Sequence, residues 1–256
     1  MSARDCRRLV CAVSLVALAA MTAVSASAAE TTSATPVVVV CLGDSVTYGA
    51  GASAGQKYPD YLQALCDHRY GKGAVKVINA GIGGNTSAQG LVRLDKDVLA
   101  HTPSVVLVYF GLNDSVKGAP GRYRVPPDDY EANLREIVSR CRAAGALVVL
   151  GRLTPVVPEL YYQRHPRQNY AADGGIMSLL SEYDRRVVRI GRDEAVAVAD
   201  LWYAFAGREE KLLRTPQNSG ARDGVHPTPE GYRTLAQAMF RVLAPLLDQA
   251  RLSEAP

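Results

Sequence analysis

The sequence predicts an α/β protein in which a parallel sheet of five strands is covered by helices on both faces, a three-layer α/β/α arrangement. Short apolar runs rich in β-branched residues alternate with longer amphipathic runs along the chain, which is the pattern of a doubly wound sheet. All the short runs except the second are close to continuously apolar, as expected of strands that are buried on both faces of a parallel sheet.

Each element follows from one of these two patterns. The strands are expected at residues 37–42, 75–79, 104–110, 146–150 and 195–199. The helices between them are expected at about 59–69, 87–100, 127–144 and 175–191. A last helix is predicted from about 228 to 249, and its apolar stripe is formed by Leu235, Met239, Val242, Leu243, Leu246 and Leu247.

The first 28 residues are predicted to be a signal peptide. Arg4, Arg7 and Arg8 give a basic start, residues 9–24 are almost unbroken apolar sequence, and Ala28 ends a small-x-small cleavage pattern. The alternative, a membrane anchor, is disfavoured because the apolar run is shorter than the roughly 20 residues that span a bilayer. We therefore expect export, cleavage near Ala28, a secreted or periplasmic location, and no stable membrane insertion afterwards.

Residues 29–256 are expected to form a single domain with one insertion. We find no internal repeat, linker or change in composition that would mark a second domain. The longest irregular stretch, about 154–174, contains several prolines and Tyr161, Tyr162 and Tyr170. These tyrosines either line a pocket for a sugar or acyl group or cover a small core of the insertion itself, and the sequence leaves both possibilities open.

The charge and the cysteines exclude some classes of function. With 29 basic and 25 acidic side chains, the net charge of +4 is small, so we expect no nucleic-acid partner. Cys41, Cys66 and Cys141 follow the predicted signal peptide and form no C-x-x-C motif. We interpret them as small buried hydrophobic side chains and expect no metal site. One disulfide among them is left open.

Four groups of polar residues lie where a site would be expected. They follow the first predicted strand (GDS, 43–45), the second (NAGIGGNT, 79–86) and the third (GLND, 111–114), and precede the last helix (DGVHP, 223–227). Ligands of open α/β sheets bind outside the carboxyl ends of the strands. Each group alone is weak evidence because glycine, asparagine and aspartate are common in turns, but together they predict one site.

These residues are suited to acyl transfer, which needs a nucleophile, a base, an orienting carboxylate and oxyanion donors. His226 is the candidate base, and Asp223, three residues earlier, can orient its imidazole. Ser45 would meet His226 if the loop before the last helix folds over the end of the first strand. Gly84 offers a backbone N–H in a loop where a side chain would block the approach, and Asn113 offers a side-chain amide.

Three nearby residues are interpreted more simply. Ser53 lies in a literal G-x-S-x-G pattern at 51–55, but the predicted strand ends well before it. A nucleophile elbow needs the strand to run directly into the serine, so we place Ser53 in a loop without a catalytic role. Asp44 is expected to accept hydrogen bonds in the turn before Ser45. His165, in the insertion, could reach the substrate, but a solvated loop histidine is the favoured interpretation.

Taken in order, GDSVTYG, NAGIGGNT, GLND and DGVHP resemble the four sequence blocks of the SGNH (GDSL) hydrolase family, and the resemblance spans about residues 37–247. It implies a flavodoxin-like architecture without metal or organic cofactor. By the family pattern, Ser45 is the nucleophile and also a backbone oxyanion donor. Gly84 supplies a second N–H, Asn113 a side-chain donor, and Asp223 and His226 complete the catalytic triad.

The stretch 87–112 is also similar to the bacterial lysophospholipase, thioesterase and arylesterase branch of that family. The resemblance implies a secreted serine esterase that hydrolyses carboxylic acyl esters. A carbohydrate O-acetylesterase is the alternative substrate class, acyl transfer to a sugar or alcohol uses the same residues, and a non-catalytic binding module on the same fold is the alternative of another kind. The expected ligand is a small-molecule, lipid or acetylated-sugar ester, and the oligomeric state is left open.

Overall fold

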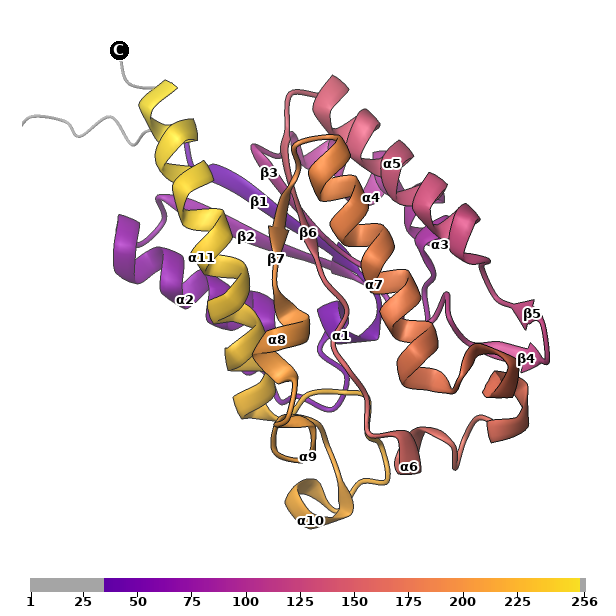
Figure 1. Ribbon diagram of the computed structural model, residues 1–256. Helices are drawn as coiled ribbons and strands as arrows, with labels where there is room; N and C mark the ends of the chain where they lie inside the picture. The colour runs from indigo at the N-terminus through magenta and orange to yellow at the C-terminus, as the bar shows by residue number, and fades with distance from the viewer. Residues whose placement is uncertain (1–34, 254–256) are drawn as a thin grey trace, which may run out of the picture. The chain divides into compact units, whose positions relative to one another are not determined.

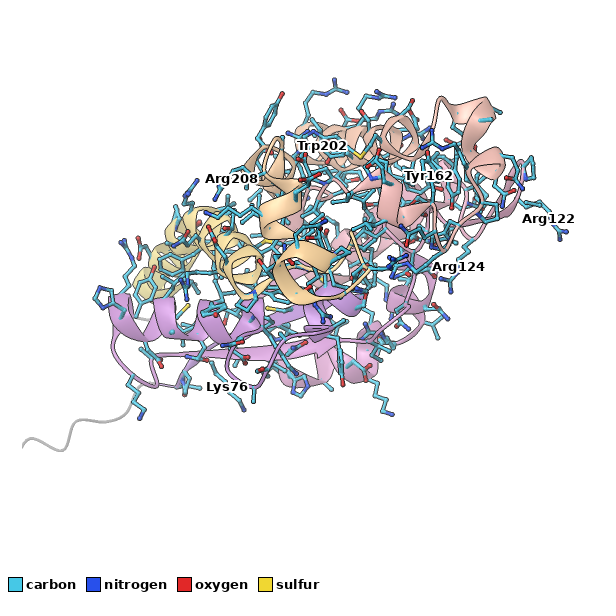
Figure 2. The ribbon with its side chains drawn as sticks, turned by 90° about the horizontal axis from the view of Figure 1, so that it is seen from below. Lys76, Arg122, Arg124, Tyr162, Trp202 and Arg208 are labelled. Atoms are coloured by element: carbon cyan, nitrogen blue, oxygen red, sulfur yellow. The ribbon has the colours of Figure 1, made fainter. Side chains whose placement is uncertain are left out.

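The computed structural model describes residues 35–253, so the predicted signal peptide lies outside the described residues. Its five-stranded sheet has the order β2-β1-β3-β6-β7 (Figure 1), and every neighbouring pair is parallel. This flavodoxin-like order confirms the predicted fold class. Figure 2 shows Lys76 on the edge strand β2 and Trp202 just after the other edge strand, at opposite sides of the sheet. The strands are β1 Val37–Gly43, β2 Val75–Gly81, β3 Val105–Tyr109, β6 Leu147–Gly151 and β7 Ala197–Ala199.

Helices cover both faces of the sheet (Figure 1). Helices α2 (Tyr58–Tyr70) and α11 (Pro229–Ser253) pack together on one face, and α5 (Pro127–Ala143) and α7 (Ile176–Asp193) pack together on the other. Among residues 35–253, no helix combines the length and the apolar character that a membrane crossing requires. The shorter elements are α1 Ser45–Tyr48, α3 Ser87–Val92, α4 Leu94–Asp97, η1 Leu99–His101, β4 Lys117–Ala119, β5 Arg122–Tyr123, α6 Pro158–Tyr161, η2 Arg167–Asp173, α8 Leu201–Phe205, α9 Glu209–Leu212 and α10 Pro216–Ser219.

The central strands are buried as the apolar runs predict. Every residue of β3 is buried, and so are most residues of β1. Cys41, Cys66 and Cys141 are buried free thiols, which agrees with their interpretation as small hydrophobic side chains.

One predicted helix is wrong. The expected helix at about 87–100 consists of α3, α4 and η1, because the backbone leaves the helical conformation at Arg93 and at Val98. The Arg93 side chain is turned inward and binds backbone oxygens at the ends of β1 and β2. The local pattern favours a helix, but these tertiary contacts interrupt it.

The insertion at 154–174 is more regular than expected and is fixed to the hairpin β4–β5. It contains α6 and η2. Lys117 of β4 is buried and forms an ion pair with Asp173 of η2, which also accepts a hydrogen bond from Tyr123 of β5 at 2.7 Å. The backbone N–H of Lys117 donates to the Tyr170 hydroxyl at 3.1 Å. The insertion is therefore an ordered wall held by buried polar contacts.

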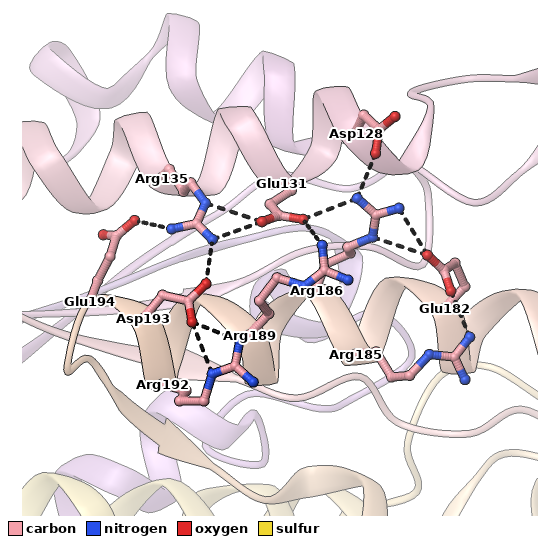
Figure 3. Close-up of polar contacts among 10 residues, drawn as sticks. All are labelled: Asp128, Glu131, Arg135, Glu182, Arg185, Arg186, Arg189, Arg192, Asp193 and Glu194. Atoms are coloured by element: carbon pink, nitrogen blue, oxygen red, sulfur yellow. Dashed lines mark hydrogen bonds and ion pairs between the residues drawn. The ribbon is translucent and has the colours of Figure 1, made fainter.

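A network of ion pairs joins α5 to α7 (Figure 3). At its centre, the Glu131 carboxylate lies 2.7 Å from Arg135, 3.0 Å from Arg186 and 3.2 Å from Arg189. The Glu131 side chain is only 12% exposed, whereas Asp128, which also pairs with Arg186, is 88% exposed. Burial acts to raise the pKa of Glu131, but the surrounding arginines outweigh it and lower the pKa below its ordinary value.

Replacing Glu131 with Gln should lower the free energy of unfolding by about 1–2 kcal/mol near neutral pH, because three arginines lose a shared and largely buried charged acceptor. A carboxylate with a lowered pKa stabilises the fold above its unfolded pKa, and this contribution disappears as the pH falls through the folded pKa. The difference between wild type and Glu131→Gln should therefore shrink in acid. Urea denaturation measures it, with Asp128→Asn as the control; equal losses for the two variants would contradict the argument.

Candidate active site

The register of the sheet brings three of the four polar groups to one edge. Gly43 pairs with Gly81 of β2 and with Tyr109 of β3, so the loops after β1, β2 and β3 begin at the same level. The turn after β1 is tight: a Cβ on Gly43 would lie 2.0 Å from Thr47 Oγ1, and one on Gly81 would lie 2.2 Å from the Tyr48 nitrogen. Glycine is required at both positions because β1 and β2 approach α1 this closely.

Asp44 makes the turn into α1, as predicted. It is the N-cap residue of α1, and its Oδ1 accepts a hydrogen bond from the Val46 N–H at 2.9 Å. Such a cap satisfies one of the free N–H groups at the start of a helix. The cap places Ser45 at the first position of α1, directly beyond the end of β1.

Ser45, His226 and Asp223 lie in one hydrogen-bonded line. His226 Nε2 is 2.8 Å from Ser45 Oγ, although the two residues are 181 positions apart in the chain. His226 Nδ1 is 2.8 Å from Asp223 Oδ2 and 3.1 Å from Oδ1. Asp223 Oδ1 also accepts from the backbone N–H groups of Val225 and His226, both at 3.1 Å. The arrangement can take the proton of the serine hydroxyl and stabilise the imidazolium that forms.

The surroundings of Asp223 favour its ionised carboxylate. Burial acts to raise its pKa, but the hydrogen bond and charge of His226, together with the charge of Arg164, lower the pKa to about 2. Arg164 Nη2 donates to the Asp223 backbone oxygen at 2.7 Å and lies 3.6 Å from Oδ1. The carboxylate is therefore ionised near neutral pH and able to orient the imidazole.

Ser45, Gly84 and Asn113 line a single cavity of about 380 Å³. The Asn113 amide is held by two long hydrogen bonds, 3.3 Å to Asp44 Oδ2 and 3.1 Å to the Asn85 oxygen. A Cβ on Gly84 would meet no protein atom within 4 Å, so the protein itself leaves room for a side chain there. That a side chain would block the approach of a ligand to the Gly84 N–H stays a prediction. The φ of +79° at Gly84 is a second reason for glycine.

The insertion supplies one wall of this cavity. Tyr161, Arg164 and His165 line it together with the apolar side chains of Ala50, Leu112, Val116 and Val225. His165 is half-buried and its ring centroid is 4.4 Å from that of Tyr161, so the expectation of a solvated histidine is wrong. Burial and the charges of Arg164 and Arg124 lower the pKa of His165.

The tyrosines of the insertion divide between the two expected roles. The Tyr161 and Tyr170 hydroxyls are 3.0 Å apart and buried, and the Tyr162 hydroxyl accepts from the Ile176 N–H at 2.7 Å. All three therefore pack within or beside the insertion. Tyr161 alone of the three also lines the cavity next to Ser45.

Arg93, which was not among the predicted site residues, holds the ends of the strands in place. Its side chain is 12% exposed. Its guanidinium donates to the Gly43 oxygen at 2.9 Å, to the Ala80 oxygen at 2.7 Å and to Asn85 Oδ1 at 2.8 Å. Arg93 thus ties together β1, β2 and the loop that carries Gly84. An arginine in an amphipathic run usually marks a solvated face, so the sequence contains no signal for this role.

Two buried carboxyl groups lie behind the site. Burial raises the pKa of Asp44 from 3.8 to about 7, against the hydrogen bond from Val46, and Asp114 adds to the rise. Asp114 accepts from the Ser87 N–H at 2.9 Å, while its Oδ2 is buried and has no hydrogen-bond partner among residues 35–253. Burial is also the main cause that raises the pKa of Asp114. Leaving carboxyl groups in such surroundings costs stability, which is expected of positions that serve a site.

The remaining candidate residues lie elsewhere. Ser53 is exposed in the loop between α1 and α2 and does not line the cavity, in agreement with its interpretation as a loop residue. Within residues 35–253, no group of three or more His, Cys, Asp or Glu side chains is arranged to hold a metal ion.

Comparison with known proteins gives a consistent picture. A family model described as the GDSL-like Lipase/Acylhydrolase family matches residues 41–234. The chain is 29% identical over 210 residues to "Thioesterase 1/protease 1/lysophospholipase L1" of Escherichia coli, covering 82% of this chain and 85% of that protein. It is 28% identical over 218 residues to the acetylxylan esterase of Geobacillus stearothermophilus, covering 78% and 90%. The crystal structure of a lipase/acylhydrolase from Enterococcus faecalis has the same fold, with a TM-score of 0.64 at 24% identity, over 80% of this chain and 93% of that one.

Replacing Asp44 with Asn should change the stability of the protein in a pH-dependent way. With its raised pKa, native Asp44 keeps a proton that the unfolded chain loses between roughly pH 4 and pH 7, so stability falls as the pH rises through this window. Asparagine keeps an acceptor for Val46 and cannot ionise. The advantage of Asp44→Asn in unfolding free energy should be about 2–3 kcal/mol larger at about pH 8 than at about pH 5.

Urea denaturation at the two pH values measures this difference. Asp128→Asn, at an exposed carboxylate, is the control and should shift stability by the same small amount at both. If Asp44→Asn behaves like that control, Asp44 is ionised in the native protein and the argument is wrong.

Proposed function

Because the chain belongs to the GDSL-like lipase/acylhydrolase family, we propose that it is an exported serine esterase that hydrolyses carboxylic acyl esters. The observation that carries the proposal is the hydrogen-bonded line from Asp223 through His226 to Ser45, with 2.8 Å between His226 Nε2 and Ser45 Oγ. A non-catalytic binding module would have no need to hold a base in contact with a hydroxyl at the wall of a cavity. Export rests on the basic, apolar and small-residue pattern of residues 1–28.

In the proposed mechanism, His226 takes the proton of Ser45 while the serine oxygen attacks the ester carbonyl carbon. Asp223 holds the imidazole by its Nδ1 and stabilises its charged form. His226 then gives the proton to the departing alcohol, which leaves the acyl group on Ser45. Water, activated by the same histidine, hydrolyses this acyl-enzyme and restores the site.

The developing oxyanion would be bound by the backbone N–H groups of Ser45 and Gly84 and by the Asn113 amide. All three residues line the same cavity. In the free site the Asn113 amide makes only long hydrogen bonds, at 3.1 and 3.3 Å, and catalytic hydrogen bonds often shorten only when the reacting group is bound. Asp44 and the Asn85 oxygen therefore orient the Asn113 amide, whose N–H groups can also donate to an oxyanion.

Two substrate classes fit the cavity. The similarity to a thioesterase and lysophospholipase supports a lipid-type or aryl ester, and the apolar side chains of Leu112, Val116 and Val225 suit an acyl chain. The similarity to an acetylxylan esterase supports a carbohydrate O-acetylesterase, and Tyr161 with His165 gives an aromatic wall on which a sugar could pack. Assays with a lysophospholipid, an acyl thioester, aryl esters of increasing acyl length and acetylated xylan separate the two classes.

The Ser45→Ala variant should lose at least roughly 10⁴-fold in kcat on 4-nitrophenyl acetate, because the covalent route is closed. Ser53→Ala, the matched control in the exposed loop, should keep the wild-type rate. A fluorophosphonate probe should label wild type and Ser53→Ala once each, at Ser45, and leave Ser45→Ala unlabelled. Wild-type turnover or labelling in Ser45→Ala would refute the assignment of the nucleophile.

The Asn113→Ala variant should lower kcat on the order of 10²–10³-fold with little change in KM, as expected when one oxyanion donor is removed. Steady-state kinetics on 4-nitrophenyl acetate gives both constants, and far-ultraviolet circular dichroism checks that the fold is retained. A rise in KM at unchanged kcat would assign Asn113 to ground-state binding of the substrate instead.

A further inference from the structure

The mouth of the candidate active-site cavity carries an excess of positive charge. Arg164 lines the cavity, and no residue that lines it is acidic. Arg124 lies beside it, since its Nη2 donates to the backbone oxygen of Gly84 at 3.4 Å. Figure 2 shows Arg124 turned toward the loops at the carboxyl edge of the sheet, whereas Arg122, two residues earlier on the hairpin, points outward into solvent.

Neither arginine has a carboxylate to itself within the described part of the chain. Arg124 has no ion-pair partner within 4.0 Å there, although Asp129 and Arg124 line a neighbouring groove together. Arg164 is 41% exposed, and its ion-pair partner, at 3.6 Å, is Asp223, whose carboxylate is already bound by His226. An arginine has five N–H donors, and the described contacts use only Nη2 of each. Both guanidinium groups therefore have donors left for a ligand.

The two charges act on the same side of the cavity. Burial lowers the pKa of His165, and the charges of Arg164 and Arg124 lower it further, so both guanidinium groups are close enough to disfavour a proton on this imidazole. The His165 ring packs on Tyr161. The cavity thus has an apolar and aromatic interior and a cationic mouth, and such a field attracts anions.

The chemistry of acyl transfer places the alcohol part of the ester at this mouth. Ser45 Oγ forms a bond to the carbonyl carbon, the bond from that carbon to the alcohol oxygen breaks, and the proton that His226 took from Ser45 passes to the alcohol oxygen. The alcohol departs to solvent while the acyl group stays on Ser45. The alcohol therefore lies on the His226 side, where Arg164 contacts Asp223, and toward the exposed rim.

We infer that Arg124 and Arg164 form a subsite for a negatively charged group on the alcohol part of the ester substrate. Carboxylate and phosphate groups share the geometry that a guanidinium binds, through paired N–H donors. This inference rests on the proposed esterase function and specifies its substrate class: esters of anionic alcohols are preferred over esters of neutral ones.

The test compares two acetyl esters that differ in one charge. 4-Acetoxybenzoate carries a carboxylate on its leaving group, and methyl 4-acetoxybenzoate is the neutral counterpart. The ratio of their kcat/KM values is measured for wild type, Arg124→Gln, Arg164→Gln and the control Arg122→Gln. Comparing ratios between variants cancels the difference in intrinsic reactivity of the two esters.

Arg124→Gln and Arg164→Gln should each lower the ratio about 5- to 10-fold, the loss expected for a charge-assisted hydrogen bond at a partly exposed site. Arg122→Gln should leave it at the wild-type value. The wild-type ratio should also fall with added salt, because exposed charges are screened. Mono-4-nitrophenyl glutarate and 4-nitrophenyl butyrate, which place the charge on the acyl side instead, should give a ratio that Arg124→Gln does not change.

Two results overturn the inference and leave the esterase proposal intact: an unchanged alcohol-side ratio in both arginine variants, or a loss confined to the acyl-side pair. In either case wild type still hydrolyses methyl 4-acetoxybenzoate through Ser45. If wild type hydrolyses none of these esters, or Ser45→Ala hydrolyses them equally well, the proposed function itself fails.

Discussion

The parallel register of β1 with β2 and β3 is the constraint on which the rest of the structure depends. Because Gly43 is level with Gly81 and Tyr109, three loops leave the sheet side by side. This edge brings Ser45 together with Gly84 and Asn113 around one cavity. Arg93 fixes the edge from behind by binding the oxygens of Gly43 and Ala80. A shift of one residue in this register would turn the side chains of β1 to opposite faces and separate the loops.

Much of the fold could be predicted because a strand that is buried on both faces must be apolar throughout. The strands β1 and β3 meet this condition. Ser45 was identifiable because turn residues at strand ends converge on one edge, and Asp223 and His226 because their spacing of three residues suits a base and its orienting carboxylate. The helix expected at 87–100 was wrong because Arg93 serves contacts far away in the chain, which no local pattern encodes. His165 could be named from the sequence as a residue within reach of the substrate, but its packing on Tyr161 could not be predicted, since it depends on how the insertion folds.

The turn before Ser45 positions the serine, and it does so at a cost in folding stability. The cap on α1 needs a side-chain acceptor at Asp44, and burial makes that acceptor expensive to ionise. Asp114, whose Oδ2 has no hydrogen-bond partner in the described part of the chain, adds to the same local cost. The surrounding sheet supplies enough buried apolar surface to tolerate both. Polar groups that weaken the fold in this way are expected around a reactive centre and are seldom found far from one.

The insertion is bonded to the segments around the active site on two sides. The Val157 N–H donates to the Gly224 oxygen at 2.8 Å, so the insertion is bonded to the loop between Asp223 and His226. On its other side, the buried pair of Lys117 and Asp173 fastens it to the hairpin. A wall anchored at both ends cannot swing aside without disturbing the histidine. The insertion is therefore part of a preformed chamber beside Ser45, and the loop that carries the base depends on the insertion for its position.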